Sequence, residues 1–271
     1  MPSSALFVKI LTRTFPQRFI IARMTRWPWI GKALDRWLFE GDDLFFLTRD
    51  KLIPINKSID PGPQICLPSQ VVEHFIQQAN YHFLMNKCIC RDGSKCKDYP
   101  IELGCLFLGE TAMQINPALG RKASKEEALE HARKCREVGL VHLIGKNKLD
   151  TVWLGIGPGE KLLTICNCCP CCCLWKVLPY LASEIAEKLT RLPGVSVSVN
   201  DQCTGCGACA ENVCFAHAIK MIDQRAVITD LCKGCGRCIE VCDQQAIEIS
   251  FADDQFLQNA IQRIAKAVDV R

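Results

Sequence analysis

This sequence lacks a large excess of either positive or negative charge, and it contains few aromatic side chains. Lysine and arginine outnumber aspartate and glutamate by only 33 to 29, which gives a formal net charge of +4. Aromatic residues make up 7% of the 271 residues. Proteins that bind nucleic acid usually carry a much stronger basic footprint. We therefore expect no nucleic-acid partner for this chain.

Long apolar runs are missing as well. No stretch reaches the roughly 18 apolar residues that a helix needs to span a bilayer. Basic residues interrupt the apolar positions near the N-terminus, and no small-residue cleavage site follows them, so a signal peptide is not indicated. These absences argue against a secreted disulfide scaffold. We expect a cytoplasmic protein whose cysteines stay reduced.

Two common cofactor signatures are also absent. The stretch GIGPGE at 155–160 lacks the G-x-G-x-x-G spacing of a dinucleotide-binding loop, so flavin or nicotinamide binding is not supported. The histidines show no paired spacing with a metal motif, and we interpret all five as structural or solvated: His74, His82, His131, His142 and His217.

Cysteine, in contrast, is abundant and unevenly placed. The chain has 20 cysteines, and 14 of them fall in the two blocks 166–173 and 203–242. The second block reads CTGCGACAENVC at 203–214 and CKGCGRCIEVC at 232–242. Both parts are C-x2-C-x2-C followed by a fourth cysteine, and each continues into an Ala-Ile pair. Such a repeat indicates thiolate ligands for iron, with zinc as the weaker alternative.

The repeat resembles the bacterial-type ferredoxin with two [4Fe-4S] clusters, and the resemblance covers about residues 195–251. In that family the fourth cysteine of each run crosses to the other cluster. Two departures from the family stand out: Phe215 and Asp243 replace the usual proline, and four residues instead of three precede Cys214. The resemblance implies one cluster on Cys203, Cys206, Cys209 and Cys242 and another on Cys214, Cys232, Cys235 and Cys238.

The surrounding residues fit a small ferredoxin-like domain at 193–252. The alternating stretch 195–199 predicts a strand, 220–228 a hairpin that turns at 223–225, and 246–251 another strand. A C-terminal helix is expected over 253–271, with Asp253 or Asp254 as its cap. Four glycines lie between the expected ligands, where the backbone must wind closely around a cluster: Gly205, Gly207, Gly234 and Gly236.

The preceding region, 66–192, is expected to form a cysteine-rich α+β domain. An amphipathic helix over 67–86, with Ser69 as its cap, leads into a first group of cysteines. Cationic side chains next to that group, such as Arg91, would stabilise an anionic cluster by Coulomb attraction. The group consists of Cys88, Cys90, Cys96 and Cys105.

A second helix of this region begins at a capping box of Ser124 and Glu127 and ends at Gly139. We interpret Cys135 on this helix as a packed thiol, and we assign no role to Cys66. Three short apolar runs follow, at 140–145, 151–156 and 161–166, and the last strand of the domain ends at a cysteine-rich loop.

That loop, CNCCPCCC at 166–173, places six sulfurs in eight positions. Pro170 favours a turn that lets a subset of them converge. Either the first group and four loop cysteines bind separate clusters, or the two groups share two close clusters or a larger non-cubane assembly. We expect at least one additional iron–sulfur cluster, with zinc or copper as the alternative. The loop candidates are Cys166, Cys168, Cys169, Cys171, Cys172 and Cys173.

The N-terminal segment, 1–65, is basic and aromatic, especially over residues 1–40. Arginine and lysine interleaved with tryptophan and phenylalanine suit a helix on an anionic membrane surface, a docking surface for a partner, or packing on the next domain. Peripheral contact with the inner face of a membrane is therefore one expectation for residues 1–40.

Taken together, these patterns predict an α+β protein in which a small cysteine-rich domain precedes a ferredoxin-like domain. The expected function is electron transfer to or from a partner redox enzyme, in an anaerobic or micro-aerobic cell. Whether the chain is itself an enzyme stays open. The alternative is a reductase whose central cluster or thiols at 166–173 act on a small substrate or disulfide, and a sulfur-transfer or maturation role is a third interpretation.

Overall fold

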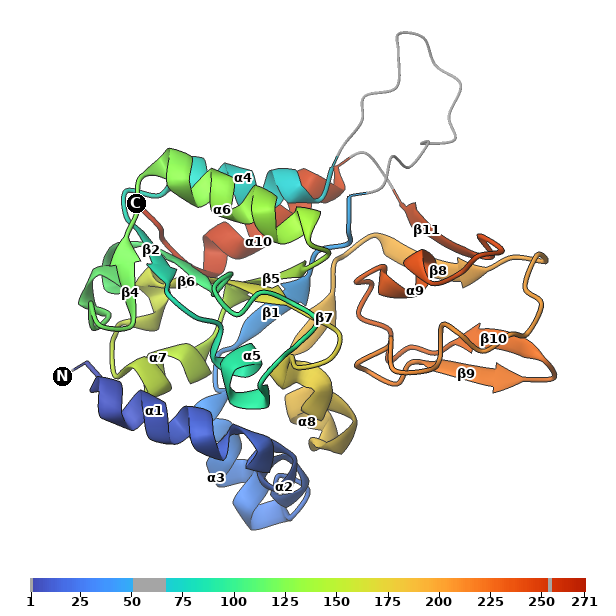
Figure 1. Ribbon diagram of the computed structural model, residues 1–271, viewed down its shortest axis with the longest axis horizontal. Coiled ribbons are helices and arrows are strands. Elements are labelled where there is room, and N and C mark those ends of the chain that lie inside the picture. The colour runs from blue at the N-terminus through green and yellow to red at the C-terminus, as the bar shows by residue number, and fades with distance from the viewer. Residues whose placement is uncertain (1, 51–66, 253–254) are drawn as a thin grey trace, which may run out of the picture.

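A seven-stranded sheet forms the centre of the structure, and helices cover both of its faces (Figure 1). The computed structural model describes residues 2–50, 67–252 and 255–271. The strand order is β4-β2-β3-β6-β5-β1-β7, and every neighbouring pair is antiparallel except β1 and β7. The strands are Asp43–Phe46 (β1), His82–Met85 (β2), Leu106–Leu108 (β3), Gly120–Lys122 (β4), Val141–Lys146 (β5), Leu163–Cys168 (β6) and Leu189–Arg191 (β7).

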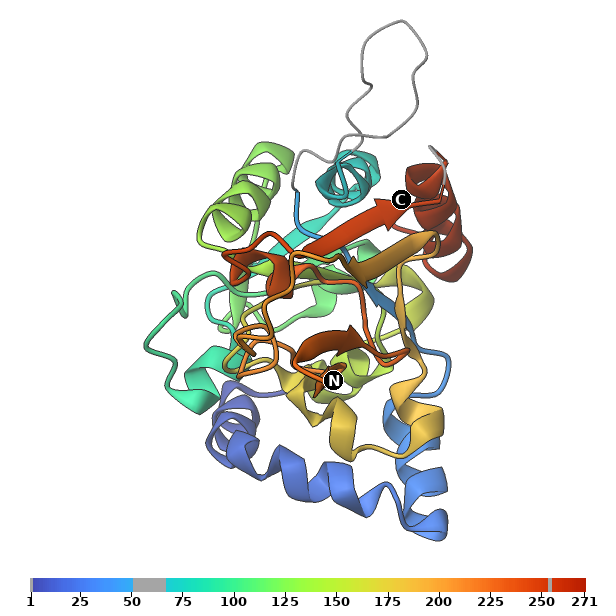
Figure 2. The ribbon, with the colours of Figure 1, turned by 90° about the vertical axis from the view of Figure 1, so that its right-hand side faces the viewer.

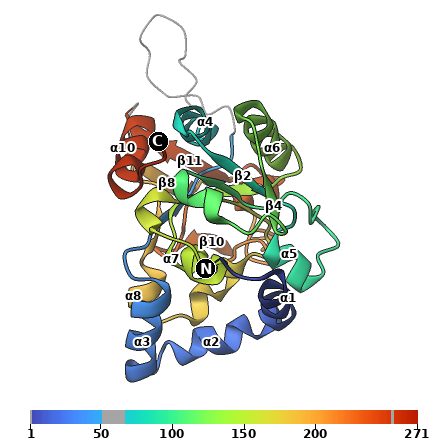
Figure 3. The same ribbon diagram turned by 90° about the vertical axis from the view of Figure 1, so that its left-hand side faces the viewer.

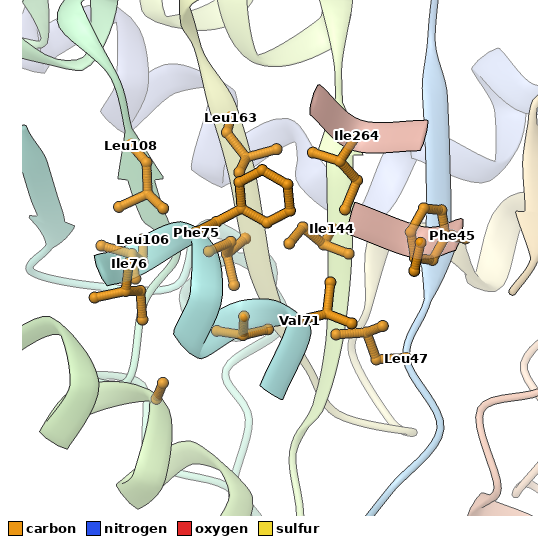
Figure 4. Close-up of a cluster of buried hydrophobic side chains, with 14 of the residues drawn as sticks. Phe45, Leu47, Val71, Phe75, Ile76, Leu106, Leu108, Ile144, Leu163 and Ile264 are labelled. Atoms are coloured by element: carbon orange, nitrogen blue, oxygen red, sulfur yellow. The ribbon is translucent and has the colours of Figure 1, made fainter. Parts of the chain in front are cut away.

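Three helices cover one face of this sheet: α4 (Ser69–Gln78), α6 (Lys125–Glu137) and α10 (Phe256–Ala267). Figure 4 shows Val71 and Phe75 of α4 against Ile144 and Leu163 of the sheet, with Ile264 of α10 beside them. All five side chains are buried, and each contributes about 1.5–3 kcal/mol by leaving water. The C-terminal helix is therefore part of the core of the sheet.

Other helices cover the opposite face, and Figure 3 shows the N-terminal three, α1, α2 and α3, away from α4, α6 and α10. Helix α1 contacts α5, and α2 contacts the 3₁₀ helix η4. One core on this side forms around Phe107 and Trp153, and another around Phe46 and Trp175. The helices are α1 Ala5–Thr14, η1 Phe15–Gln17, α2 Arg18–Met24, α3 Pro28–Leu38, α5 Ile89–Ser94, η2 Glu110–Gln114, α7 Lys148–Leu154, η3 Gly159–Lys161, η4 Leu174–Tyr180 and α8 Ser183–Ala186.

The cysteine repeat lies at one end of the molecule and faces the viewer in Figure 2. It contains two small antiparallel pairs, β8 (Val195–Val199) with β11 (Ile247–Phe251) and β9 (Ile219–Ile222) with β10 (Arg225–Ile228), and a short helix α9 (Arg237–Glu240). Asp223 and Gln224 form the two-residue turn of the β9–β10 hairpin, and both have positive φ.

Several predicted elements are confirmed. The chain is α+β, the strands and the hairpin of the repeat form as expected, and the Ser124–Glu127 capping box is present at the start of α6. The apolar runs at 140–145 and 161–166 become β5 and β6. The expected cap at Asp253 or Asp254 lies outside the described residues, as does Cys66.

Other expectations were wrong. The helix over 67–86 ends at Gln78, and the next residues form the buried strand β2. Ser69 is not its cap; instead, the carboxylate of Asp50 accepts the backbone N–H of Ser69 at 2.9 Å. Most of the run at 151–156 belongs to helix α7.

The sheet also extends beyond the boundaries expected for the central region. Strand β1 comes from the N-terminal segment, and α10 comes from the end of the chain. Within the described residues, no helix has both the length and the apolarity to cross a membrane.

Candidate iron–sulfur sites

The eight cysteines of the repeat lie in two neighbourhoods. We call Cys203, Cys206, Cys209 and Cys242 the outer quartet, because the charges of the other three act on Cys209 and Cys206 is exposed. We call Cys214, Cys232, Cys235 and Cys238 the inner quartet, because the charge of Cys214 acts on the other three, and Cys238 also packs in one apolar group with three cysteines of the outer quartet. Each quartet thus brings three cysteines of one run beside the fourth cysteine of the other.

The two halves of the repeat use the same backbone contacts. The N–H of Ala218 donates to the sulfur of Cys214 at 3.2 Å, and the N–H of Ala246 donates to the sulfur of Cys242 at 3.3 Å. In both halves the residue before the alanine has positive φ, 50° at His217 and 52° at Gln245. The Ala-Ile pairs seen in the sequence therefore mark a repeated N–H···S turn, which stabilises anionic sulfur.

The glycines of the repeat all adopt left-handed backbone, as expected: Gly205, Gly207, Gly234 and Gly236 have φ between +67° and +81°. At Gly205 the space is also closed, because an added Cβ would lie 2.1 Å from the carbonyl oxygen of Gln224 in the hairpin turn. At Gly207 an added Cβ would meet nothing within 4 Å. Glycine is therefore required at Gly205 for both its conformation and its lack of volume.

The inner quartet lies against the sheet. Phe215 packs on Phe46 of β1 with ring centroids 4.6 Å apart, and the hydroxyl of Thr48 donates to the carbonyl of Gly234 at 2.8 Å. The buried guanidinium of Arg237 donates to the carbonyl of Cys168 at the end of β6. Phe215, at the position where the ferredoxin family has proline, thus makes an aromatic contact between the repeat and the sheet.

The ten central cysteines are brought together from three segments, and cysteines of the first group lie among those of the loop, which is the sharing that the sequence leaves open as one of two arrangements. Cys105 immediately precedes β3, and Cys166 lies opposite it on β6. Because side chains alternate along a strand, Cys166 and Cys168 point to one face of the sheet while Ile165 packs into the core of the other. Cys96 separates from Cys88, Cys90 and Cys105, so these four do not form one set.

Six of these cysteines, which we call the six-thiol set, form three close pairs. The sulfurs of Cys105 and Cys166 are 3.5 Å apart. A hydrogen bond from Cys90 lowers the pKa of Cys88 to about 6, and the bond to Cys88, together with burial, raises the pKa of Cys90. Cys168 and Cys173 form the third pair, and the charges of the three pairs also act on one another. The set consists of Cys88, Cys90, Cys105, Cys166, Cys168 and Cys173.

The remaining four cysteines, which we call the four-thiol set, are Cys96, Cys169, Cys171 and Cys172. Their sulfurs all lie within 4.8 Å of one another. Among the histidine, cysteine and acidic side chains of the described residues, no other group of three or more has its ligand atoms this close together. Among the described side chains, the four-thiol set is therefore the group of three or more possible ligands that is compact enough for a single metal ion.

Buried arginines border these thiols. Arg91 is fully buried, and its guanidinium donates to the carbonyls of Pro100, Leu103 and Asn167. Burial lowers the pKa of Arg91, but the charges of the surrounding cysteines, Cys88 and Cys169 among them, more than offset this. Neither Arg91 nor Arg237 forms an ion pair with a carboxylate in the described residues. A buried cation without a carboxylate needs another source of negative charge.

A polar network holds β6 from its other side. The amide of Asn167 donates to the carbonyl of Gly104 at 2.7 Å, and its oxygen lies 2.8 Å from Nδ1 of His142. His131 of α6 also reaches the Gly104 carbonyl, at 2.9 Å. Asn167 separates Cys166 from Cys168, so this network fixes the strand that carries two of the six thiols. Burial lowers the pKa of His142 to about 4.

Sequence reasoning missed Arg18 and Arg237. Arg237 occupies the position that Ala208 takes in the first half of the repeat, and this asymmetry was the available signal. Arg18 of α2 stacks on Phe15 and Phe19, and the charges of Cys90, Cys172 and Cys173 act on it. No local pattern connects Arg18 to these thiols. Of the cations expected around the first cysteine group, Arg91 is buried among the thiols whereas Lys95 and Lys97 are exposed.

Comparison with protein families gives one match. Residues 210–252 match the family model of the LdpA Fe-S cluster-binding domain. No curated protein and no solved structure matches the chain. The matched segment contains the inner quartet and Cys242. With the central cysteine sets, this match makes the chain a metal-binding, iron–sulfur protein.

Proposed function

We propose that this protein is an electron carrier with at least three iron–sulfur clusters. The outer and inner quartets each bind one [4Fe-4S] cluster, as the ferredoxin resemblance implies, and the six-thiol set binds a further cluster. Electrons enter or leave through the outer cluster, exchange with a partner redox protein, and pass through the inner cluster to the central one. Iron carries the charge and the thiolates hold the iron.

The observation that carries this proposal is a shared buried cluster at the end of β6. Cys166, Cys168 and Cys173 of the six-thiol set pack in one apolar group with Cys214, Cys232 and Cys235 of the inner quartet, around Phe46 and Phe215. Apolar surroundings exclude water from the space between the two redox centres, and the shared packing holds their ligands close together. Arg237 lies between them, bonded to the Cys168 carbonyl, and its charge acts on Cys173 and Cys235.

The outer quartet fits a role as the site of exchange. Cys206 is exposed, and the β9–β10 hairpin, whose Ala226 N–H donates to the Cys203 sulfur, exposes large apolar side chains, including Ile222 and Val227 at 48% and 37%. Exposed apolar surface beside a redox centre suits transient docking of a protein partner. The expected anaerobic or micro-aerobic setting follows from the oxygen sensitivity of exposed clusters.

The N-terminal helices offer a second surface. Basic side chains interleave with exposed apolar ones, and Trp29 of α3 is 90% exposed. We propose peripheral membrane contact for this surface, since tryptophan and cationic residues suit the interface of an anionic bilayer. Co-sedimentation with anionic vesicles would decrease for Trp29→Ser, and equal partitioning of variant and wild type would remove the proposal.

The electron-carrier proposal is tested by counting iron and following its reduction. Anaerobically purified protein would contain clearly more than the eight irons that two cubanes supply, about four each. Replacing Cys232 by Ser would remove the inner cluster and slow reduction of the central one by a protein-sized donor at least about tenfold, with Cys135→Ser as the matched thiol control. About eight irons in wild type, or an unchanged rate in C232S, would overturn the proposal.

A reductase is the second candidate, because six thiols exceed the four ligands of a cubane. The described residues disfavour it in one respect, because Cys88, Cys168 and Cys173 are buried. A central EPR signal that changes when a small thiol or disulfide is added would favour the reductase over the carrier.

A further inference from the structure

We propose that the four-thiol set binds a single metal ion in a tetrahedral site that is separate from the iron–sulfur clusters. The ligands would be the sulfurs of Cys96, Cys169, Cys171 and Cys172. The ion would be zinc or mononuclear iron, both of which accept four thiolates in a tetrahedron. Such a site has no open coordination position and would serve structure.

The size of the set is the first argument. A metal–sulfur bond of about 2.3 Å places tetrahedral sulfurs about 3.8 Å apart. The sulfurs of Cys96 and Cys171 are 3.5 Å apart, as are those of Cys171 and Cys172, and all four lie within 4.8 Å. The corners of a cubane hold their thiolates farther apart than this. The four-thiol set therefore has the dimensions of a site for one ion.

The backbone builds this site from two segments. Helix α5 ends at Ser94, the next residue Lys95 has φ of 51°, and the N–H of Cys96 donates to the carbonyl of Arg91 at 2.9 Å. This helix end turns Cys96 toward the loop. In the loop, Pro170 follows Cys169, and the N–H of Cys172 donates to the Cys169 sulfur at 3.3 Å. Both elements orient sulfur before any ion binds.

Hydrogen bonds and charge around the sulfurs also suit a bound ion. Backbone N–H groups of Asp98 and Tyr99 lie near the Cys96 sulfur. A divalent ion with four thiolates carries a net charge of −2, and Arg91 supplies a buried positive charge that acts on Cys169. Donors to ligand sulfur and a nearby cation are the usual outer shell of thiolate metal sites.

The surroundings indicate a structural role. Cys169 and Cys172 are buried, whereas Cys96 and Cys171 are half-buried, so the ion could enter from one side. Apolar contacts with Leu103 and Leu140 close the other side. Cys135 of α6 lies in the same apolar group, but it is not among the four gathered sulfurs. One ion would therefore fasten the loop after α5 to the cysteine-rich loop.

The test compares metal content in full-length variants. Cys96→Ser and Cys171→Ser each remove one half-buried ligand, and Cys135→Ser is the control from the same apolar group. Zinc and iron are measured after anaerobic purification, and EPR is recorded to detect high-spin ferric iron in a tetrathiolate site. We expect C96S and C171S to lose one metal ion per chain and C135S to lose none.

The identity of the lost ion separates the two metals. Loss of one zinc assigns zinc, and loss of one iron with its high-spin ferric signal assigns mononuclear iron; either supports the proposal. Loss of about four irons with a cluster signal would overturn it in favour of a cubane. An unchanged metal content in both variants would overturn it as well. Limited proteolysis near residue 96 provides a second readout, because loss of the ion should speed cleavage there in C96S but not in C135S.

Discussion

The C-terminal repeat and the central region both gather thiols, but they do so in different ways. In the repeat, each quartet takes three sulfurs from one short glycine-containing loop, and backbone N–H groups of Ala218 and Ala246 point at ligand sulfurs. In the central region, the six-thiol set joins α5, the start of β3 and the end of β6. One site is built by local turns, and the other is built by a sheet.

The two regions also treat charge differently. The outer quartet is partly open, with Cys206 exposed, so water and backbone dipoles can stabilise its negative charge. The central thiols lie beside Arg91, which is fully buried, and near Arg18. The difference teaches that a locally built cluster site can remain near solvent, whereas a site within a protein core needs built-in cations.

The largest expected effect concerns the local turns of the repeat. Gly205→Ala should abolish the outer cluster, because the new Cβ would clash with the Gln224 carbonyl and φ is +75°. Left-handed backbone by itself costs about 1–2 kcal/mol in a residue other than glycine. Anaerobic iron analysis should show a loss of about four irons per chain.

Gly207→Ala is the matched control for this prediction. Gly207 has φ of +79° but open space at the Cβ position, so the variant should keep its iron and lose only about 1–2 kcal/mol of unfolding free energy. Equal iron in both variants would show that close approach at Gly205 does not govern the outer site.

A smaller effect is expected where the two regions meet. Arg237→Met removes the cation between Cys235 and the Cys168 carbonyl, so adding an electron to either neighbouring cluster should become harder. The reduction potentials of the inner and central clusters should fall by on the order of 60 mV, since this corresponds to about 1.4 kcal/mol for one electron. Redox titration followed by EPR measures the change.

Charge and structure can be separated at this position. Arg237→Lys keeps the positive charge and should restore most of the potential, while the exposed Lys220→Met should leave both potentials unchanged. If Met and Lys at position 237 lower the potentials equally, the guanidinium acts through packing and not through its charge.

An effect on stability alone, with no loss of iron, is expected for the network behind β6. The pKa of His142 is about 4 in the folded protein and about 6.5 when unfolded, because burial disfavours the cation. Between these values the unfolded chain binds more protons, so the unfolding free energy falls as pH decreases through this window. At pH 5 the loss from His142 should be about 2 kcal/mol relative to pH 7.

Thermal unfolding at pH 7 and pH 5 checks this prediction with His142→Gln. Glutamine retains an amide that can bond to Asn167 but does not titrate, so the variant should lose less stability on acidification than wild type. Parallel pH profiles for the two proteins would mean that His142 does not contribute to the acid sensitivity of the central region.

Much of the repeat could be predicted from the sequence. The motif spacing, the glycines and the strands at 195–199 and 246–251 depend on neighbours along the chain, and the hairpin turn needs only two residues with positive φ. The structure of the central region could be predicted less well from the sequence. Its sequence predicts Ser69 as a helix cap, whereas the capping carboxylate comes from Asp50, which is distant in the sequence.

The grouping of the central cysteines shows the same limit. The spacing of Cys88, Cys90, Cys96 and Cys105 suggested that they could form one set, but the end of α5 sends Cys96 away from the other three. Nothing local pairs Cys105 with Cys166; that contact results from the register of β3 with β6. Cross-strand neighbours are set by sheet pairing, which a single sequence does not display.

By itself, the sequence determined that this chain binds metal through cysteine, that its C-terminal repeat is a cluster-binding module, and that the fold is α+β. The tertiary structure alone decided that ten central thiols separate into sets of six and four, and that Arg91, Arg237 and Phe215 lie between or beside them. The physical reason is the separation along the chain of the residues that interact. Turns and ligand loops depend on adjacent residues, whereas shared burial and charge compensation depend on segments that meet only after the sheet has formed.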